Sequence, residues 1–476
     1  MESKGSRKGL MDRFIDRIEG DKVVLFIVSA LTLISALAIF SSTSQLAGGS
    51  LDRMDLIKEH LQWVICGYAF ILVIYKIKSI RTIRIASQLG FLVSFTLLLL
   101  LDCRIKSGFI SAINLNDAYR ILRIGGFQLH VFEATKVCMV MYVAWALHSY
   151  RQDCEAMEKN KKSPTFTIAN RLSRISWLSF LKTPRSKRII YLYAPVLIVA
   201  GMVLPGSNSS MMLIGGICFL MLMIGKMPMK EIGIILGTGV AVIGICAGIF
   251  LISNGKIFED TRLKQLFTRI GADYSIERLI DVENDSAYGP KSREWYRVLD
   301  KIRQPYGAQI AIHEGGIFGK FSGNSTQKYV VAHIYSDYMF SFIVEEYGLL
   351  GGIVILILFI SLLARGSYIS SMCKNDFAKY AVGGLSLLIS GQAFLHILVN
   401  VGITPMTGQT LPMISDGSFA FVMFCIAFGI ILSISRMAQQ QIRQEEEAMR
   451  PLYEKQDDLQ ATMDVLEMID NYDEER

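Results

Sequence analysis

Ten apolar segments, each near the length of a helix that crosses a lipid bilayer, constrain this chain more than any other feature. Such a helix needs about 20 predominantly apolar residues. The segments are residues 23–40, 60–75, 87–101, 133–148, 189–203, 211–224, 232–252, 338–363, 381–401 and 419–434. We therefore predict an all-α fold, a polytopic membrane protein with about ten transmembrane helices and one large extracytoplasmic loop.

The composition of the 476 residues agrees with a membrane protein. Hydrophobic residues make up 52%, charged residues only 19%, and the mean hydropathy is +0.39. These values argue against a soluble globular, disordered or collagen-like chain. The eight cysteines include no CxxC pair or Cys/His set, which argues against zinc or redox chemistry. Basic and aromatic residues do not interleave as they do in nucleic-acid sites, so we expect no nucleic-acid partner.

The charges of the loops predict the topology. An even number of spans places both termini on one side of the membrane, and the loops of that side are rich in Lys and Arg, whereas the short alternate loops 204–210 and 402–418 contain none. By the positive-inside rule both termini are cytoplasmic. The predicted organisation is a cytoplasmic segment 1–22, helices one to seven in 23–253, a large extracytoplasmic loop 254–337, helices eight to ten in 338–434, and an acidic cytoplasmic tail 435–476.

The first polar stretch on the extracytoplasmic side leads into the fourth apolar segment. It contains Arg120, followed by Glu133 and Lys136, which are three residues apart and can pair on a helix. One interpretation is that these residues belong to a functional site. The other is an intramembrane ion pair that only stabilises packing.

A glycine-rich stretch, 315–328, is the second candidate. Its glycines would let the backbone approach a phosphate, and Lys320 and Lys328 would neutralise the charge. The stretch is not a Walker A loop, because Gly319-Lys320 is followed by Phe321. Judged by the glycines alone, an ordinary turn is the better interpretation.

Asp337, at the predicted mouth of the eighth helix, is the third candidate. A carboxylate there can act as a general base, as a ligand of a divalent metal or as the N-cap of the helix. Glu345 lies eight residues further on and could support the same cavity, whereas Glu346 points nearly opposite and would meet a neighbouring helix.

The segment between the last two apolar runs, 400–418, is the fourth candidate. Two prolines and several glycines predict a re-entrant or unwound loop, which a membrane protein tolerates where it is buried or lines a cavity. We therefore expect this segment to line the site.

Together these four stretches resemble the SEDS family, which comprises FtsW, RodA and SpoVE. The family pattern N-G-A-x-R-W with a later Glu and Lys is matched at Asn116, Arg120, Glu133 and Lys136. The pattern G-G-L-F-G-K-G and then G-x-S-x-Q-K is matched in 315–328, and the pattern D-F-I-F-A-x-x-x-E-E-x-G begins at Asp337. The fourth pattern, N-x-G-x-x-P-x-T-G-x-x-L-P-x-I-S-x-G-x-S, is carried by Asn400, Gly402, Pro405, Thr407 or its neighbour, Gly408, Leu411, Pro412, Ser415 and Gly417.

The resemblance implies a peptidoglycan glycosyltransferase in the bacterial cytoplasmic (inner) membrane that polymerises lipid II. Asp337 matches the essential acid of the family, as a catalytic base or as a ligand of a divalent cation, Mg or Mn. The residues implied in substrate binding are Arg120, Glu133, Lys136, Lys320, Ser325, Gln327, Lys328, Glu345, Asn400, Thr407 and Ser415. The implied partners are a class B penicillin-binding protein and other divisome or elongasome proteins, and the acidic tail favours an FtsW-like division role.

The sequence departs from the family around Asp337. Where relatives read L-P-E-x-H-T-D, this chain has Ala332-His333 and Tyr335-Ser336 before the acid, and His333 or Asp416 are candidates to replace the lost groups. Two other functions stay open at this point. One is a transporter or flippase of lipid-linked precursors, and the other is a scaffold without catalysis for a class B penicillin-binding protein.

Overall fold

Each predicted apolar segment falls on a helix to within one residue. The computed structural model describes residues 19–43, 53–105, 107–115, 118–159, 166, 183–204, 206–252, 276–284, 292–404 and 407–474. The helices of the first half are α2 (Lys22–Ser42), α3 (Arg53–Tyr75), α4 (Ile80–Asp102), α5 (Val131–Glu158), α7 (Pro184–Arg188), η3 (Ile189–Tyr193), α8 (Ala194–Val203), α9 (Asn208–Ile224) and α10 (Met229–Ile252). Those that follow are α12 (Ile276–Asn284), α13 (Arg293–Gly315), η5 (Gln327–Tyr329), α14 (Met339–Met372), α15 (Asp376–Asn400) and α16 (Ser418–Glu474).

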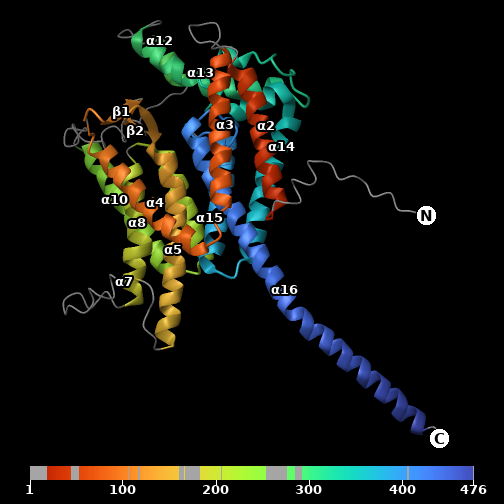
Figure 1. Cartoon of the computed structure of the whole chain (residues 1–476). Helices are drawn as coiled ribbons and strands as arrows, with labels where there is room; N and C mark the ends of the chain where they lie inside the picture. Colours follow the sequence, from red (N-terminus) through yellow and green to blue (C-terminus); the bar gives the residue numbers. More distant parts are fainter. Residues whose placement is uncertain are drawn as a thin grey trace, which may run out of the picture.

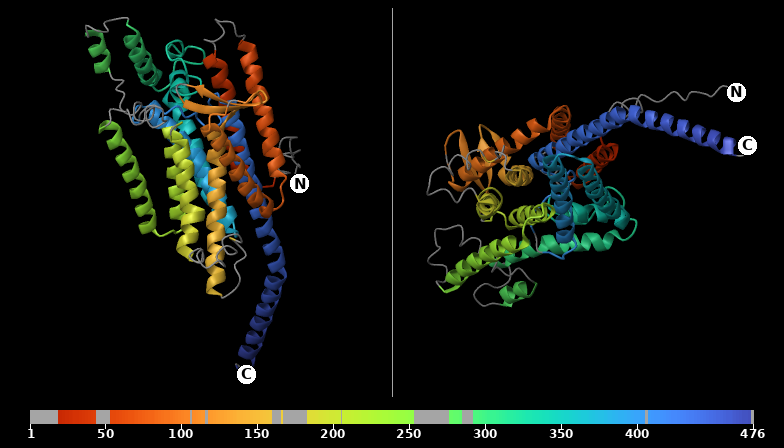
Figure 2. Two further views of the ribbon diagram at one scale, coloured as in Figure 1. Left: turned by 90° about the vertical axis from the view of Figure 1, so that its left-hand side faces the viewer. Right: turned by 90° about the horizontal axis from the view of Figure 1, so that it is seen from below.

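The structure confirms a polytopic helical membrane protein. Eight of the described helices are long and apolar enough to cross a membrane: α2, α3, α4, α5, the continuous run of α7, η3 and α8, then α14, α15 and α16. The sixth predicted segment corresponds to α9, a shorter apolar helix, and the seventh to α10. The long helices run side by side, and α16 continues well beyond the bundle (Figures 1 and 2). We call the end from which α16 projects the tail side and the opposite end the loop side.

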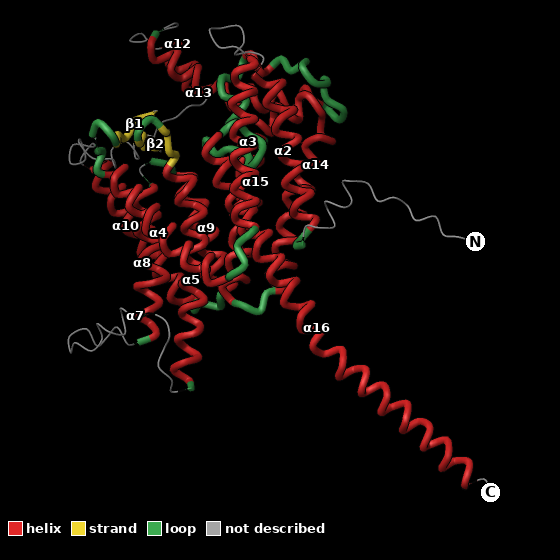
Figure 3. The backbone as a smooth tube through the Cα atoms, viewed as in Figure 1, coloured by secondary structure: helices red, strands yellow, loops and turns green. Residues whose placement is uncertain are grey.

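A small antiparallel sheet on the loop side was not predicted from the sequence. It joins α4 to α5 and has the strands β1 (Ile110–Leu115), β2 (Ala118–Ile124) and β3 (Phe127–His130) in the order β1-β2-β3. Gly125 and Gly126 form its two-residue turn, at φ of 58° and 118°, which is the backbone that such hairpins require. The sheet is visible above α4 in Figure 3 as its yellow segment.

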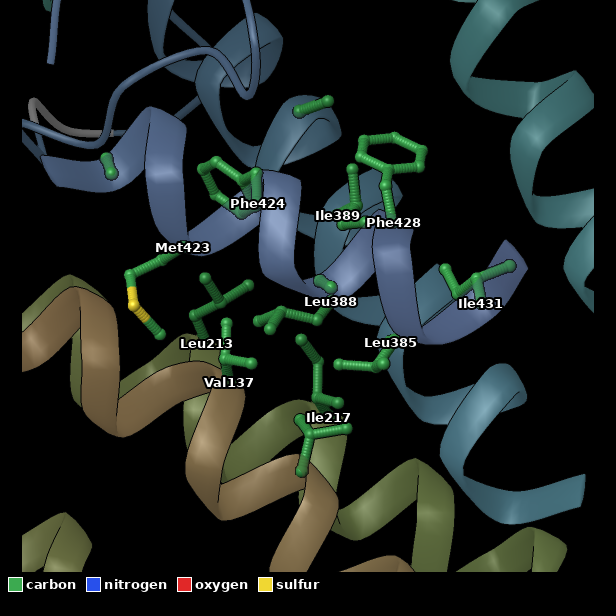
Figure 4. Packing of buried hydrophobic residues seen from close by; sticks show 14 of the residues in the cluster. Val137, Leu213, Ile217, Leu385, Leu388, Ile389, Met423, Phe424, Phe428 and Ile431 are labelled. Atoms are coloured by element: carbon green, nitrogen blue, oxygen red, sulfur yellow. The ribbon is translucent and has the colours of Figure 1, made fainter. Parts of the chain in front are cut away.

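The core of the bundle is packed by side chains from α5, α9, α15 and α16. Leu213 and Ile217 of α9 meet Leu385 and Leu388 of α15, with Phe424 of α16 close by (Figure 4). These residues are almost completely buried. Because this core ties the helices that carry the polar candidates, the loop-side ends of α5, α9 and α15 are held close together.

Candidate active site

Two segments that lie far apart in the sequence are joined at the loop side. The Ser415 hydroxyl donates to the carbonyl oxygen of Ser336 at 2.7 Å, and the Asp416 N–H donates to that of Tyr335 at 2.9 Å. Asn400 Nδ2 donates to the carbonyl oxygen of Asp337 at 3.2 Å. The turn before α14 is therefore fastened to the end of α15 and to the segment that leads into α16.

Asp337 is half-buried in this joint, and its carboxylate is not a helix cap. Ser336 Oγ donates to Asp337 Oδ1 at 3.3 Å, and the Asp337 N–H donates to the carbonyl oxygen of His333 at 3.0 Å. The N-cap residue of α14 is Tyr338, without a side-chain capping bond. The first turn of α14 is instead satisfied by Asn400, whose Oδ1 accepts the Ser341 N–H. The N-cap interpretation of Asp337 is therefore wrong, and its carboxylate is left for chemistry.

Burial raises the pKa of Asp337 above its ordinary value of 3.8, while the positive charges of His333 and Arg120 act to lower it. The pKa of neighbouring Asp416 is also raised, by burial and by the charge of Glu59. Burial and the charges of Asp416 and Asp337 raise the pKa of Tyr335 in turn. Acidic groups with perturbed pKa values are typical of functional sites. A general base transfers protons most efficiently when its pKa lies near the pH at which the enzyme works.

Arg120 lies on β2 beside this site. Its Nε donates to the carbonyl oxygen of Gly206 at 2.9 Å, which fixes the sheet to the turn before α9. Its charge acts on Asp337 and also on His130, whose pKa burial and Arg120 lower. The structure therefore brings two residues predicted from separate stretches, Arg120 and Asp337, into one electrostatic environment. Asn116, the start of the first motif, lies outside the described residues.

Lys136 is the centre of a buried polar network below the segment 407–417. Its ammonium donates to Glu133 Oε1 at 2.7 Å, as the spacing predicted, and also to Gln392 Oε1 at 2.6 Å and Gln409 Oε1 at 3.0 Å. Its side chain is 1% exposed. The structure thus gives the ammonium three protein acceptors, and direct contact with substrate stays a prediction.

Gln409 extends this network to α9 and α15. Its Nε2 donates to Ser209 and Ser210, each at 3.0 Å, while Ser209 donates to the carbonyl oxygen of Thr407 at 2.8 Å. Gln392 Nε2 donates to the carbonyl oxygen of Thr410 at 2.9 Å. The backbone of the segment is therefore satisfied by side chains from neighbouring helices, as an unwound segment at membrane depth requires.

The glycine-rich stretch forms a second cluster around Glu345, which is fully buried. Oxygens of Glu345 accept from Lys320 Nζ at 2.9 Å, from Ser325 Oγ at 2.5 Å, and from the N–H groups of Thr326 and Gln327 at 2.8 and 3.2 Å. Lys320 also pairs with Glu314. The charge that this loop surrounds in the structure is therefore the protein's own carboxylate, and contact with a substrate phosphate stays a prediction.

Glu346 meets a neighbouring helix, as its position predicted. Its Oε1 accepts from Ser41 Oγ of α2 at 2.6 Å and from the N–H of Gly323 at 2.9 Å. Lys328 Nζ donates to the carbonyl oxygen of Gly323 at 2.8 Å and is buried. The two adjacent glutamates thus hold the glycine-rich stretch against the start of α14 and the end of α2.

The comparison with known families decides what kind of protein this is. The sequence profile of the family FTSW_RODA_SPOVE, described as "Cell cycle protein", matches residues 21–440. The chain belongs to the FtsW/RodA/SpoVE family. The match begins next to the start of α2 and ends within α16, so it includes the helices and the candidate site described above.

Named relatives within the FtsW/RodA/SpoVE family match over different lengths. A "Probable peptidoglycan glycosyltransferase FtsW" of Enterococcus hirae is 26% identical over 437 residues, which cover 90% of this chain and 95% of the relative. The same name is given to a Hahella chejuensis protein that is 37% identical over 158 residues, 32% of this chain and 40% of the relative. "Peptidoglycan glycosyltransferase MrdB" of Escherichia coli K12 is 34% identical over 146 residues, 29% of this chain and 40% of the relative.

Solved structures with low sequence identity share the fold of this chain. A chain of a structure described as "Structural coordination of polymerization and crosslinking by a peptidoglycan synthase complex" superposes with a TM-score of 0.55 at 18% identity, covering 88% of this chain and 99% of that one. The rod shape determining protein RodA of Thermus thermophilus superposes with a TM-score of 0.52 at 16% identity, covering 88% and 98%.

Several site residues of this family member were missed from the sequence. Gln392 and His396 lie inside the ninth apolar segment, where a polar side chain signals a function or a buried partner. The imidazole Nδ1 of His396 lies 2.7 Å from the carbonyl oxygen of Gln409. The serines at 209 and 210 gave no comparable signal, because serine is common at the start of helices.

Proposed function

We propose that this chain is a SEDS-type peptidoglycan glycosyltransferase that polymerises lipid II into glycan strands. The proposal rests on the environment of Asp337. In a chain of this family, it is a half-buried carboxylate with a raised pKa that is held in place through its backbone and is not used to cap α14.

Asp337 would act as the general base of glycosyl transfer. It would take the proton from the acceptor sugar hydroxyl, whose oxygen forms the new bond to the anomeric carbon of the donor sugar. The bond from that carbon to the pyrophosphate oxygen breaks, and the pyrophosphate departs with the electron pair. Arg120, whose charge acts on Asp337, would stabilise the negative charge of the leaving group.

A divalent cation, Mg²⁺ or Mn²⁺, is compatible with this site as a cofactor. Among the described residues no group of three or more His, Cys, Asp or Glu could hold a metal ion. A site with one carboxylate, Asp337, fits the way Mg²⁺ binds through one or two carboxylates, substrate phosphates and water. When bound, the ion would lower the pKa of the acceptor hydroxyl and neutralise the pyrophosphate.

The partners and the location of the chain follow from the same proposal. The loop side would face the cell exterior, with both termini cytoplasmic in the bacterial inner membrane, which the distribution of Lys and Arg supports. A class B penicillin-binding protein would supply crosslinking, as the description of the similar synthase complex suggests. The match to an FtsW-named relative over nearly the whole chain favours division over elongation, with divisome proteins as further partners.

The test is polymerisation by purified protein. The full chain, with and without its class B penicillin-binding protein, is given lipid II and Mg²⁺ or Mn²⁺, and the products are separated on a gel. We expect a glycan ladder that Asp337→Asn abolishes and that Asp55→Asn, a change in the exposed Asp55–Lys58 pair, leaves intact. If lipid II binds but no ladder forms under any of these conditions, a transporter or a scaffold replaces the enzyme.

A further inference from the structure

An exposed apolar loop lies beside the loop-side end of α14. Ile317, Phe318 and Phe321 belong to the glycine-rich stretch, yet Phe318 is 73% and Phe321 is 72% exposed. The polar side chains of Lys320, Ser325 and Thr326 in the same stretch instead donate to the buried Glu345. Several large apolar side chains exposed next to one another in this way mark a surface that meets another protein or a membrane.

The backbone of this loop is hydrogen-bonded to α14 at a kink in that helix. Gly348 has φ of 70° and ψ of −175°, which interrupts the helical hydrogen bonds. The freed N–H of Leu349 donates to the carbonyl oxygen of Gly316 at 2.9 Å, and that of Leu350 donates to Ile317 at 3.4 Å. In return, the N–H of Lys320 donates to the carbonyl oxygen of Glu345 at 2.9 Å.

The loop and α14 approach each other so closely at the kink that the contacting positions must be glycines. A Cβ atom on Gly348 would lie 2.1 Å from the carbonyl oxygen of Ile317, and one on Gly319 would lie 2.3 Å from that of Glu346. The backbone polar groups of the loop that face α14 are thus satisfied by α14 itself. A non-helical backbone can lie at membrane depth only under that condition.

Two helices place this loop at the boundary of the hydrocarbon layer. On the tail side, Asp21 caps α2 and pairs with Arg365 of α14 at 2.5 Å, so one ion pair marks the same level on both helices. The 21 residues of α2 that follow span about 30 Å, the thickness of a bilayer core. On α14, Arg365 and Glu346 are 19 positions apart, which at the rise of an α-helix corresponds to about 28 Å.

The lengths measured along α2 and along α14 end at the same level, because Ser41 near the end of α2 donates to Glu346 of α14. With the Asp21–Arg365 pair taken as the tail-side boundary of the hydrocarbon, the loop-side boundary falls at the level of Ser41, Glu346 and Gly323. Gly316 and Ile317, which bond to Leu349 and Leu350, lie about one helical turn deeper. The helices α2 and α14 lie side by side in Figure 1, with the loop at their upper ends.

We propose that residues 316–321 form a membrane-inserted wedge whose partner is the acyl chains of the loop-side lipid leaflet. The wedge is continuous with an exposed apolar row on α14, formed by Leu349, Leu350, Ile353 and Val354, and no charged residue occurs on α14 between Leu349 and Ala364. Lys320, held by Glu314 and Glu345, then lies at the level of the lipid headgroups. This inference does not depend on the proposed enzymatic activity.

The test measures whether lipid tails reach the wedge. The full chain carrying Phe318→Trp is placed in phosphatidylcholine nanodiscs with or without bromine on the acyl chains, and wild-type emission is subtracted. The matched control is Tyr296→Trp, an exposed aromatic position of α13. We expect brominated lipid to reduce the added emission of F318W about twofold or more and to leave that of Y296W unchanged, because bromine acts only near the hydrocarbon.

A second tryptophan position in the wedge keeps the proposal testable if Phe318→Trp does not fold. Phe321→Trp retains an aromatic side chain at the other exposed end of the wedge and should be quenched in the same way. If folded F318W and F321W both show the same emission in the two lipids, the loop does not enter the membrane, and the apolar surface would be a docking site for another protein.

Discussion

Asn400, the last residue of α15, caps the first turn of α14 through Ser341. Its Oδ1 accepts the Ser341 N–H at 3.0 Å and the Ser341 hydroxyl at 2.8 Å, while its Nδ2 holds the carbonyl oxygen of Asp337. Asn400 is thus the last residue of α15, caps the start of the preceding helix α14, and holds the backbone of the proposed base. Because the cap comes from another helix, the carboxylate of Asp337 is not needed to cap the start of α14.

Asn400→Ala should reduce both stability and polymerisation. Loss of an N-cap costs about 1 kcal/mol, and loss of the Nδ2 bond releases the backbone of Asp337, so activity should fall further than stability alone explains. The measurements are the thermal unfolding midpoint and the rate of glycan formation. Asn375→Ala is the matched control, because Asn375 caps α15 at the tail side through the Phe377 N–H at 3.0 Å. Equal loss of activity in both variants would show that Asn400 contributes only stability.

Lys136→Met should destabilise the protein strongly. It leaves Glu133 without its cation and removes the donor to Gln392 and Gln409, and breaking one partner of a buried ion pair costs about 3 kcal/mol or more. The unfolding midpoint should drop, and the double variant with Glu133→Gln should recover part of the loss. Lys58→Met, in an exposed pair, should change little. A midpoint that stays at the wild-type value in K136M would contradict the network.

The pH dependence of polymerisation should report Asp337. A base must be ionised, and burial raises the pKa of Asp337, so the rate should fall with decreasing pH at a midpoint above 3.8. Removing a positive charge that lowers this pKa should move the midpoint upward, and we expect that for His333→Gln. Arg123→Gln removes a positive charge from β2 that is not among the charges acting on Asp337, so this control should leave the midpoint in place. A downward shift in H333Q would be incompatible with Asp337 as the titrating base.

The stability of the folded protein should show the opposite trend with pH. A carboxyl group whose pKa is raised on folding favours the folded state while it is neutral, and this contribution is lost as the pH rises from the unfolded value of about 3.9 through the raised value. Asp337→Asn should therefore flatten the decline of the unfolding midpoint over this range. A decline of the same steepness in D337N would assign it to another group, such as Asp416.

Glu345→Gln should loosen the glycine-rich stretch without unfolding the bundle. The variant keeps the shape of the side chain but loses the charge that Lys320, Ser325 and two backbone N–H groups face, and each charge-assisted bond contributes about 1.5–3 kcal/mol. Hydrogen exchange in residues 316–328 should accelerate, while that in α15 should not. Glu447→Gln, on the exposed part of α16, is the control. Unchanged exchange in this stretch would mean that the carboxylate charge is not what orders it.

The partners of the glycine-rich stretch could not be predicted from the sequence. Its glycines and lysines were compatible with a phosphate site or with a turn, because both need a close backbone approach and donors. Only the packing of the stretch against α14 shows that its donors face Glu345 and Glu346 in the folded chain. The spacing of the glutamates predicted that they diverge, but not that both would serve the same loop.

The sequence by itself determined the membrane fold, the number and position of the apolar helices, and the stretches from which the site is built. These depend on local hydrophobicity and on motif residues that are read along the chain. Only the tertiary structure decided that Asn400 caps α14, that Lys136 supports Gln409, and that Gly316 and Ile317 fill the kink at Gly348. Each of these contacts joins residues from different helices or loops, and buried polar groups select such partners from whatever the packed helices bring within reach.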